Sequence, residues 1–128
     1  MKVGEEQHSD HTVLRLAGSL KVGETAKAFS ERIEKVAIEG TGALILEMSE
    51  LEYVDSTGVG LLVAAYRHFQ PLKRELILVN PQRRVLSGLR VTHLDTLFPI
   101  HESLDLALAA LARKEGEETG EQRTRGDL

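Results

Sequence analysis

Two short apolar runs constrain the fold of this chain most strongly. They cover residues 43–48, A-L-I-L-E-M, and residues 76–79, L-I-L-V. A strand that is covered on both faces reads as a nearly continuous apolar run, whereas a strand with one wet face alternates apolar and polar residues. Because segments with helical spacing lie between these runs, we expect a single-domain α/β fold whose central strands are parallel and joined by right-handed crossovers.

The N-terminal segment is expected to add an antiparallel hairpin to that sheet. Residues 11–18 alternate between two faces, which is the period of a strand. Residues 2–7 are polar and indicate at most an edge strand, and Ser9 and Asp10 between the two segments are a turn signal. The sheet is therefore predicted to be mixed and mostly parallel.

About four helices are predicted around the sheet. The first covers 24–38 and ends at residues 40–42, the second covers about 58–69, the third begins at Asn80-Pro81, and the fourth begins at Ser103. Residues 97–100 are expected to form a short edge strand, since the proline at position 99 cannot donate to a ladder.

The C-terminal residues differ in composition from the rest. Residues 114–127 contain no aliphatic or aromatic side chain, so we expect them either to extend the last helix or to be disordered. The sequence is therefore divided into a domain at residues 1–113 and a charged tail at residues 114–128.

The amino-acid composition narrows the classes of protein to which this chain can belong. The 128 residues carry a formal net charge of -4 and no cysteine, which gives no reason to expect a nucleic-acid partner and excludes disulfide and thiolate chemistry. The first residues do not read as a signal peptide, and no run approaches the roughly 18 apolar residues of a membrane span. We expect a cytoplasmic protein without membrane insertion.

No arrangement of residues predicts an autonomous catalytic or metal site. Ser56 lacks the G-x-S-x-G elbow of hydrolases, because Val54 stands in the place of the first glycine. His68 lies on the same helix, roughly 18 Å from Ser56 at 1.5 Å per residue. The glycines at residues 40–42 precede a strand and indicate a helix stop, and no P-loop or metal-binding histidine spacing is present. We therefore expect no enzyme activity, catalytic residue, metal or cofactor.

The turn at residues 54–60, V-D-S-T-G-V-G, has a plain and a functional interpretation. The plain one is an N-cap, in which the hydroxyl of Ser56 or Thr57 accepts from an otherwise unpaired N–H. Gly58 and Gly60 argue against a cap alone, because each glycine costs about 1 kcal/mol relative to alanine inside a helix. Two glycines in the first turn indicate that another surface approaches the backbone here.

Ser56 also stands where a phosphate would be favoured. A helix N-terminus carries a partial positive charge and free N–H groups, although the like charge of Asp55 opposes part of that benefit. Ser56 needs no local base as a substrate, because a separate kinase brings its own. A partner packed over Ser56 and Val59 would not tolerate the added charge and bulk, so modification would change the surface rather than the fold.

The stretch at residues 46–61, L-E-M-S-E-L-E-Y-V-D-S-T-G-V-G-L, resembles the hallmark of STAS domains, and more closely that of bacterial anti-sigma factor antagonists. The resemblance covers about residues 10–112. It includes G-S-L at residues 18–20 and S-L-D-L-A-L at residues 103–108, which are weak motifs alone.

The resemblance implies a switch. Ser56 would be the phosphoacceptor, and the partner would be an anti-sigma factor with serine kinase activity. The unphosphorylated form would bind that partner and release the sigma factor; a phosphatase and a homodimer are left open. The partner-binding residues would be Asp55, Thr57, Gly58, Val59 and Gly60, together with Lys21.

Lys21 departs from the family pattern, which commonly has an aspartate after G-x-L. A lysine there reverses a charge on the partner surface and bears on the choice of kinase. The alternative is a STAS interaction subunit of a lipid-transport or stress-signalling complex, without phosphoswitching. An enzyme or nucleotide binder is the least favoured hypothesis, since no phosphate cradle is present.

Overall fold

The computed structural model describes the backbone of residues 1–127 and the surroundings of side chains through residue 116. In chain order the elements are β1 (Lys2–His8), β2 (His11–Leu20), α1 (Glu24–Glu39), β3 (Leu44–Val54), α2 (Ser56–Phe69), η1 (Gln70–Leu72), β4 (Leu76–Val79), α3 (Arg83–Val91), η2 (Leu94–Thr96), β5 (Ile100–His101) and α4 (Leu104–Asp127). The two 3₁₀ turns, η1 and η2, follow α2 and α3.

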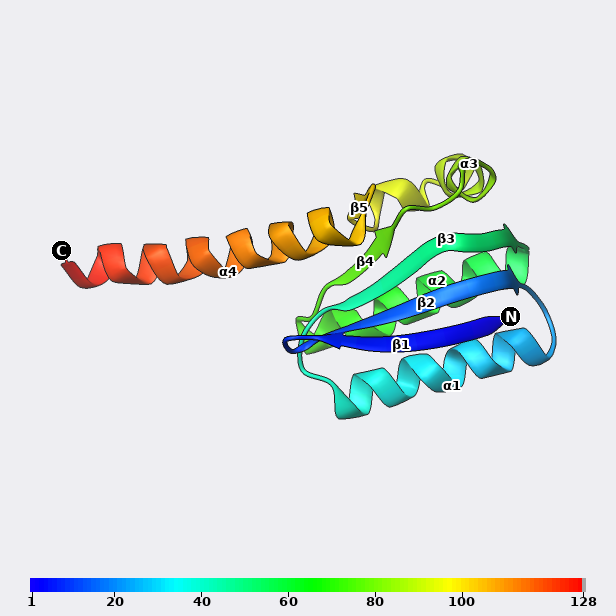
Figure 1. Cartoon of the computed structure of the whole chain (residues 1–128), viewed down its shortest axis with the longest axis horizontal. Coiled ribbons are helices and arrows are strands. Elements are labelled where there is room, and N and C mark those ends of the chain that lie inside the picture. Colours follow the sequence, from blue (N-terminus) through cyan, green and yellow to red (C-terminus); the bar gives the residue numbers. More distant parts are fainter. Residues whose placement is uncertain (128) are drawn as a thin grey trace.

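The strands form one five-stranded sheet in the order β1-β2-β3-β4-β5. β1 is antiparallel to β2, and the remaining neighbours pair in parallel. The prediction of an α/β fold with a mixed sheet, an N-terminal hairpin and about four helices is confirmed. Figure 1 shows α1 and α2 running alongside each other, while α4 leaves the domain at the end opposite to the tips of β2 and β3.

The apolar run in β3 is explained by packing on both faces of the sheet. Leu44 and Leu46 belong to the larger core cluster, to which α1, α2 and α3 contribute. Ile45, between them, joins a smaller cluster with Ala107 and Leu111 of α4. Residues 44–46 thus enter two separate cores in alternation, which explains why all three are apolar.

Two predicted elements begin at the wrong residue. The third helix was expected at Asn80-Pro81, but α3 begins at Arg83. Asn80 has a positive φ of 51° and donates its backbone N–H to the carbonyl of His101 in β5 at 2.8 Å, so it is held in a non-helical conformation next to the sheet. The edge strand expected at residues 97–100 begins only at Ile100, because the N–H groups of Leu97 and Phe98 both bond to the carbonyl of Leu94 in the preceding turn.

The expected ends of two other helices are confirmed. Gly40 is the C-cap of α1, and the Ser103 hydroxyl accepts from the N–H of Leu106 at 3.1 Å at the start of α4. α4 continues through Asp127, so the helical form of the tail is the one observed, and Leu128 lies outside the described residues. The division between domain and tail at residue 113 stays a prediction.

No helix in residues 1–127 combines the length and apolar content needed to cross a membrane.

One arginine joins the helical layer to the sheet at its N-terminal edge. Arg74 donates to the carbonyls of Gly42 at 2.6 Å, Ala37 at 3.0 Å and Val36 at 3.3 Å, and its guanidinium lies 4.7 Å from the ring centre of Phe69. Two of these carbonyls belong to the last turn of α1, whose final C=O groups have no partner within the helix. Burial lowers the pKa of the Arg74 guanidinium, but an arginine remains charged at any ordinary pH.

We predict that Arg74→Met lowers the free energy of unfolding by about 2–3 kcal/mol, because it leaves partly buried carbonyls without donors. Urea unfolding followed by circular dichroism measures the change. Lys73→Gln is the matched control, since the exposed Lys73 side chain makes no hydrogen bond or ion pair with a described residue. Equal stability of the two variants would contradict the role assigned to Arg74.

Candidate functional site

The predicted site lies where two central parallel strands end together. Leu20 at the end of β2 pairs with Val54 at the end of β3. The loop after β2 therefore lies beside the turn after β3, at the carboxyl edge of the sheet, which is the usual place for functional loops in such folds. This arrangement brings Lys21 to the serine turn, where its positive charge acts on the carboxylate of Asp55.

Asp55 is the N-cap of α2, and the predicted cap by a hydroxyl is wrong. Its Oδ1 accepts from the N–H of Gly58 at 2.8 Å, and its Oδ2 accepts from the N–H of Val22 at 3.1 Å. The two oxygens of the carboxylate accept one amide each, so one side chain binds donors from two segments. The cap therefore closes the first turn of α2 and fixes the loop after β2 with one side chain.

These bonds also determine the charge of Asp55. The amide of Gly58 lowers the pKa of the Asp55 carboxyl most, followed by the amide of Val22, while partial desolvation works in the opposite direction. The Thr57 amide and the Lys21 ammonium lower the pKa further. The carboxylate is thus ionised at neutral pH and faces the positive end of the helix dipole.

Ser56 is the first residue of α2, and its side chain is exposed. Because Asp55 serves as the cap, the hydroxyls of Ser56 and Thr57 make no hydrogen bond with any described residue. Thr57 is exposed as well. The structure therefore places an unengaged hydroxyl at a helix N-terminus, where a visiting enzyme can reach it.

The two glycines of the turn have different explanations. A Cβ on the buried Gly58 would collide with the carbonyl oxygen of Leu20 and come within 2.7 Å of Cγ1 of Val54. The close approach expected at Gly58 is thus made by this chain's own β2. A Cβ on Gly60 would meet nothing within 4 Å, and Gly60 is exposed. Only Gly60 is left for the interpretation that an outside surface approaches the backbone.

Two exposed apolar side chains at this edge were not singled out from the sequence. Val22 is 69% exposed and follows Lys21 in the loop that Asp55 holds; Tyr53 is 46% exposed and precedes the turn. Val59, which was predicted, is half-buried. The only signal for Val22 was an aliphatic residue in a loop bounded by Gly23, which is too common to indicate a site.

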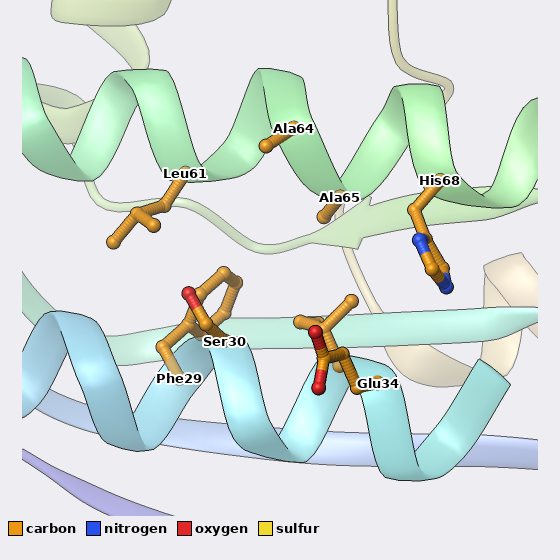
Figure 2. A pocket seen from close by; sticks show the side chains of 8 residues that line it. Phe29, Ser30, Glu34, Leu61, Ala64, Ala65 and His68 are labelled. Carbon is orange, nitrogen blue, oxygen red and sulfur yellow. The ribbon is translucent and has the colours of Figure 1, made fainter. Parts of the chain in front are cut away.

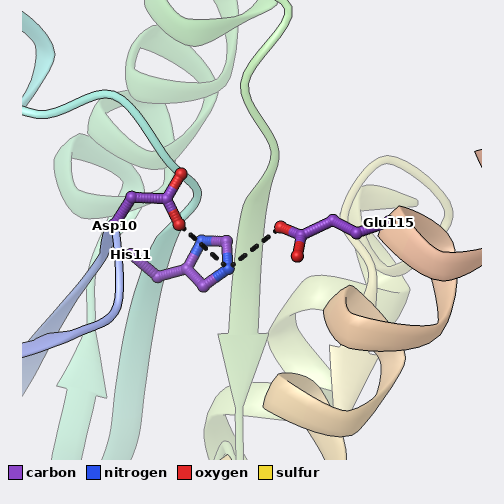
Figure 3. A group of neighbouring side chains, drawn as sticks. All are labelled: Asp10, His11 and Glu115. Carbon is purple, nitrogen blue, oxygen red and sulfur yellow. Dashed lines mark ion pairs between the residues drawn. The ribbon is translucent and has the colours of Figure 1, made fainter. Parts of the chain in front are cut away.

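A second cluster of polar side chains lies at the opposite edge of the sheet. The Nε2 atom of His11 is 3.6 Å from Asp10 and 3.5 Å from Glu115 of α4 (Figure 3). Its Nδ1 atom accepts from the N–H of Ala43 at 2.9 Å. A neutral imidazole has one donor and one acceptor nitrogen, so Nε2 carries the hydrogen and offers no lone pair to a metal ion. The arrangement fits a bridge between the hairpin and α4, and it does not fit a metal site.

Comparison with known proteins identifies the family of this chain. The STAS domain model matches residues 3–107. The anti-sigma-B factor antagonist of Listeria monocytogenes is 27% identical over 96 residues, which are 75% of this chain and 83% of that protein. An anti-sigma factor antagonist from Mycobacterium paratuberculosis has a TM-score of 0.70 at 27% identity, covering 85% of this chain and 92% of that one. The Bacillus cell fate determinant SpoIIAA in the phosphorylated form has a TM-score of 0.69 at 20% identity, covering 86% and 99%.

The two glycines give opposite predictions for the same substitution. Gly58→Ala should lower the free energy of unfolding by about 1–3 kcal/mol, because the added methyl group displaces the end of β2. Gly60→Ala should raise it by up to about 1 kcal/mol, because alanine is the better helix former and the space is open. Urea unfolding of both variants measures the two changes in the free energy of unfolding. A tolerated alanine at position 58 would contradict the packing described for Leu20.

The lowered pKa of the Asp55 carboxyl predicts that the stability of the fold depends on pH. Its pKa is lower in the folded than in the unfolded chain, so the unfolded chain binds the proton first as the pH falls. The stabilisation by Asp55 is therefore present above the ordinary aspartate pKa of about 3.9 and is lost on further acidification. We expect Asp55→Asn to be less stable than the wild type at pH 7 and the difference to shrink below about pH 4. Unfolding curves across this range provide the measurement, and a difference that stayed constant with pH would contradict the account. Glu52→Gln, at an exposed carboxyl nearby, is the matched control.

Proposed function

Because this chain belongs to the STAS domain family, we propose that it is an anti-sigma factor antagonist, a regulatory protein without enzyme activity. The observation that carries the proposal is the exposed Ser56 hydroxyl at the start of α2, which Asp55 leaves unengaged. The proposed partner is an anti-sigma factor with serine kinase activity. Binding of unphosphorylated antagonist to that partner would release the sigma factor for transcription.

The comparisons support this proposal at different levels. The relative from Listeria is named an anti-sigma-B factor antagonist, and the similarity covers three quarters of this chain. SpoIIAA shares the fold and has been solved in a phosphorylated form. The proposal for this chain rests on the geometry at Ser56, since fold alone does not determine function.

The phosphate is proposed to act on the surface. It would add close to two negative charges at pH 7 next to Asp55, whose carboxylate already occupies the amides of Gly58 and Val22. The new charge would find no free amide at those two donors and would extend outward from the exposed Ser56. A partner seated over Thr57, Val59 and Gly60 would then be repelled, while the core beneath is unchanged.

Lys21 gives the proposed interface its distinctive charge. It is exposed and lies beside Asp55, so a partner would meet a positive and a negative group in one loop pair. A complementary partner would place an acidic group near Lys21. The second candidate is a STAS interaction subunit of a lipid-transport or stress-signalling complex, which would bind through this turn without a phosphate switch. Proteins that co-purify with the tagged chain, a kinase-like anti-sigma factor or transporter subunits, separate the two.

We predict that the cognate anti-sigma kinase and ATP label the chain once, on Ser56. Ser56→Ala should abolish the label, whereas Thr57→Ala, at the neighbouring exposed hydroxyl, should keep it. Ser56→Asp should lose partner binding and shift the melting temperature by less than about 2 °C, because the site is exposed. Mass spectrometry and calorimetry measure these outcomes, and labelling that persisted in Ser56→Ala would overturn the assignment.

A further inference from the structure

A groove between α1 and α2 extends along α2 away from Ser56. It has a volume of about 120 Å³, and its apolar walls come from Phe29, Ile33, Leu61 and Ala64 (Figure 2). Gly60 and the groove residue Ala64 are four positions apart on α2 and therefore share a face of the helix, so the groove lies in line with the open part of the serine turn. Ala64 lies roughly 12 Å along the helix from Ser56 at 1.5 Å per residue.

Polar groups from both helices meet in this groove. Figure 2 shows the Ser30 hydroxyl and the Glu34 carboxylate of α1, and the His68 ring of α2, pointing into the gap. Glu34 is exposed and makes no hydrogen bond or ion pair with any residue in the described part of the chain. The groove thus combines apolar walls with an uncompensated negative charge at the end distant from Ser56.

We propose that this groove receives an arginine side chain of the protein that docks on the serine turn. The methylene stem of an arginine can lie along Phe29, Ile33 and Leu61 while its guanidinium reaches Glu34. A carboxylate accepts a guanidinium through two parallel hydrogen bonds. The location of the occupant rests on the proposed function, because the groove continues from the surface assigned to the kinase partner.

Other occupants fit the groove less well. A purely apolar side chain would cover the Glu34 carboxylate without giving it a partner, which is unfavourable. An anion would be repelled by Glu34. A lysine supplies the charge, but its ammonium is more strongly hydrated and lacks the flat, bidentate geometry of a guanidinium. The chemistry of the groove therefore selects arginine.

The first experiment uses a probe that does not depend on the partner. N-acetyl-arginine-N-methylamide is titrated into the ¹⁵N-labelled full chain, and N-acetyl-citrulline-N-methylamide, its uncharged analogue, is the control. We expect the amides of Ser30, Ala64 and His68 to shift with the arginine probe, saturating at roughly 1–10 mM, and not with citrulline. Glu34→Gln should weaken this response at least fivefold, and Ala64→Leu should abolish it by filling the groove. Glu31→Gln, an exposed acid of α1 outside the groove, should leave it unchanged.

The second experiment uses the kinase partner. Glu34→Gln and Ala64→Leu should each weaken the complex at least tenfold, and Glu31→Gln should not. The inference is overturned if the arginine probe leaves the groove unshifted, if citrulline acts equally, or if Glu34→Gln binds probe or partner as the wild type does. Absence of Ser56 labelling, with the arginine response intact, would instead overturn the proposed function alone.

Discussion

The carboxylate of Asp55 holds the proposed binding edge of this protein together. One oxygen binds the first turn of α2 and the other binds the loop between β2 and α1. In the second bond, the donor Val22 and the acceptor Asp55 are 33 residues apart in sequence. They are adjacent in space because β2 and β3 pair in parallel and end together. Gly58 completes the arrangement, since a side chain there would separate α2 from the end of β2.

Within this single turn, the residues that serve folding are separate from those proposed to serve recognition. Asp55 and Gly58 face inward and serve the chain's own contacts, whereas Ser56, Thr57 and Gly60 are left outside. The proposed modification of Ser56 would therefore change the exposed surface and leave the core unchanged. This arrangement suits the proposed switch, because the phosphorylated and unphosphorylated states need not differ in folding stability.

The central strands could be predicted because their burial on both faces leaves a direct signature in the sequence. The start of α3 could not, since Asn80 uses its N–H for a bond to His101, a residue that lies far along the chain. The identity of the cap was missed for a similar reason: both aspartate and serine are good caps, and the amide of Val22 selects the aspartate. Ser56, Gly60 and Lys21 could be proposed as site residues from the motif, and that role stays a prediction, whereas Glu34 becomes notable only when α1 and α2 are side by side.

The bridge from His11 to α4 lies at the other end of the sheet from the serine turn. β3 alone separates the two edges by roughly 33 Å at 3.3 Å per residue, and α4 points away from the tips of β2 and β3 (Figure 1). The molecule therefore has α4 at one end and the Ser56 turn at the other. Immobilised through α4 on a biosensor chip, it would present the Ser56 edge unobstructed to the fluid phase.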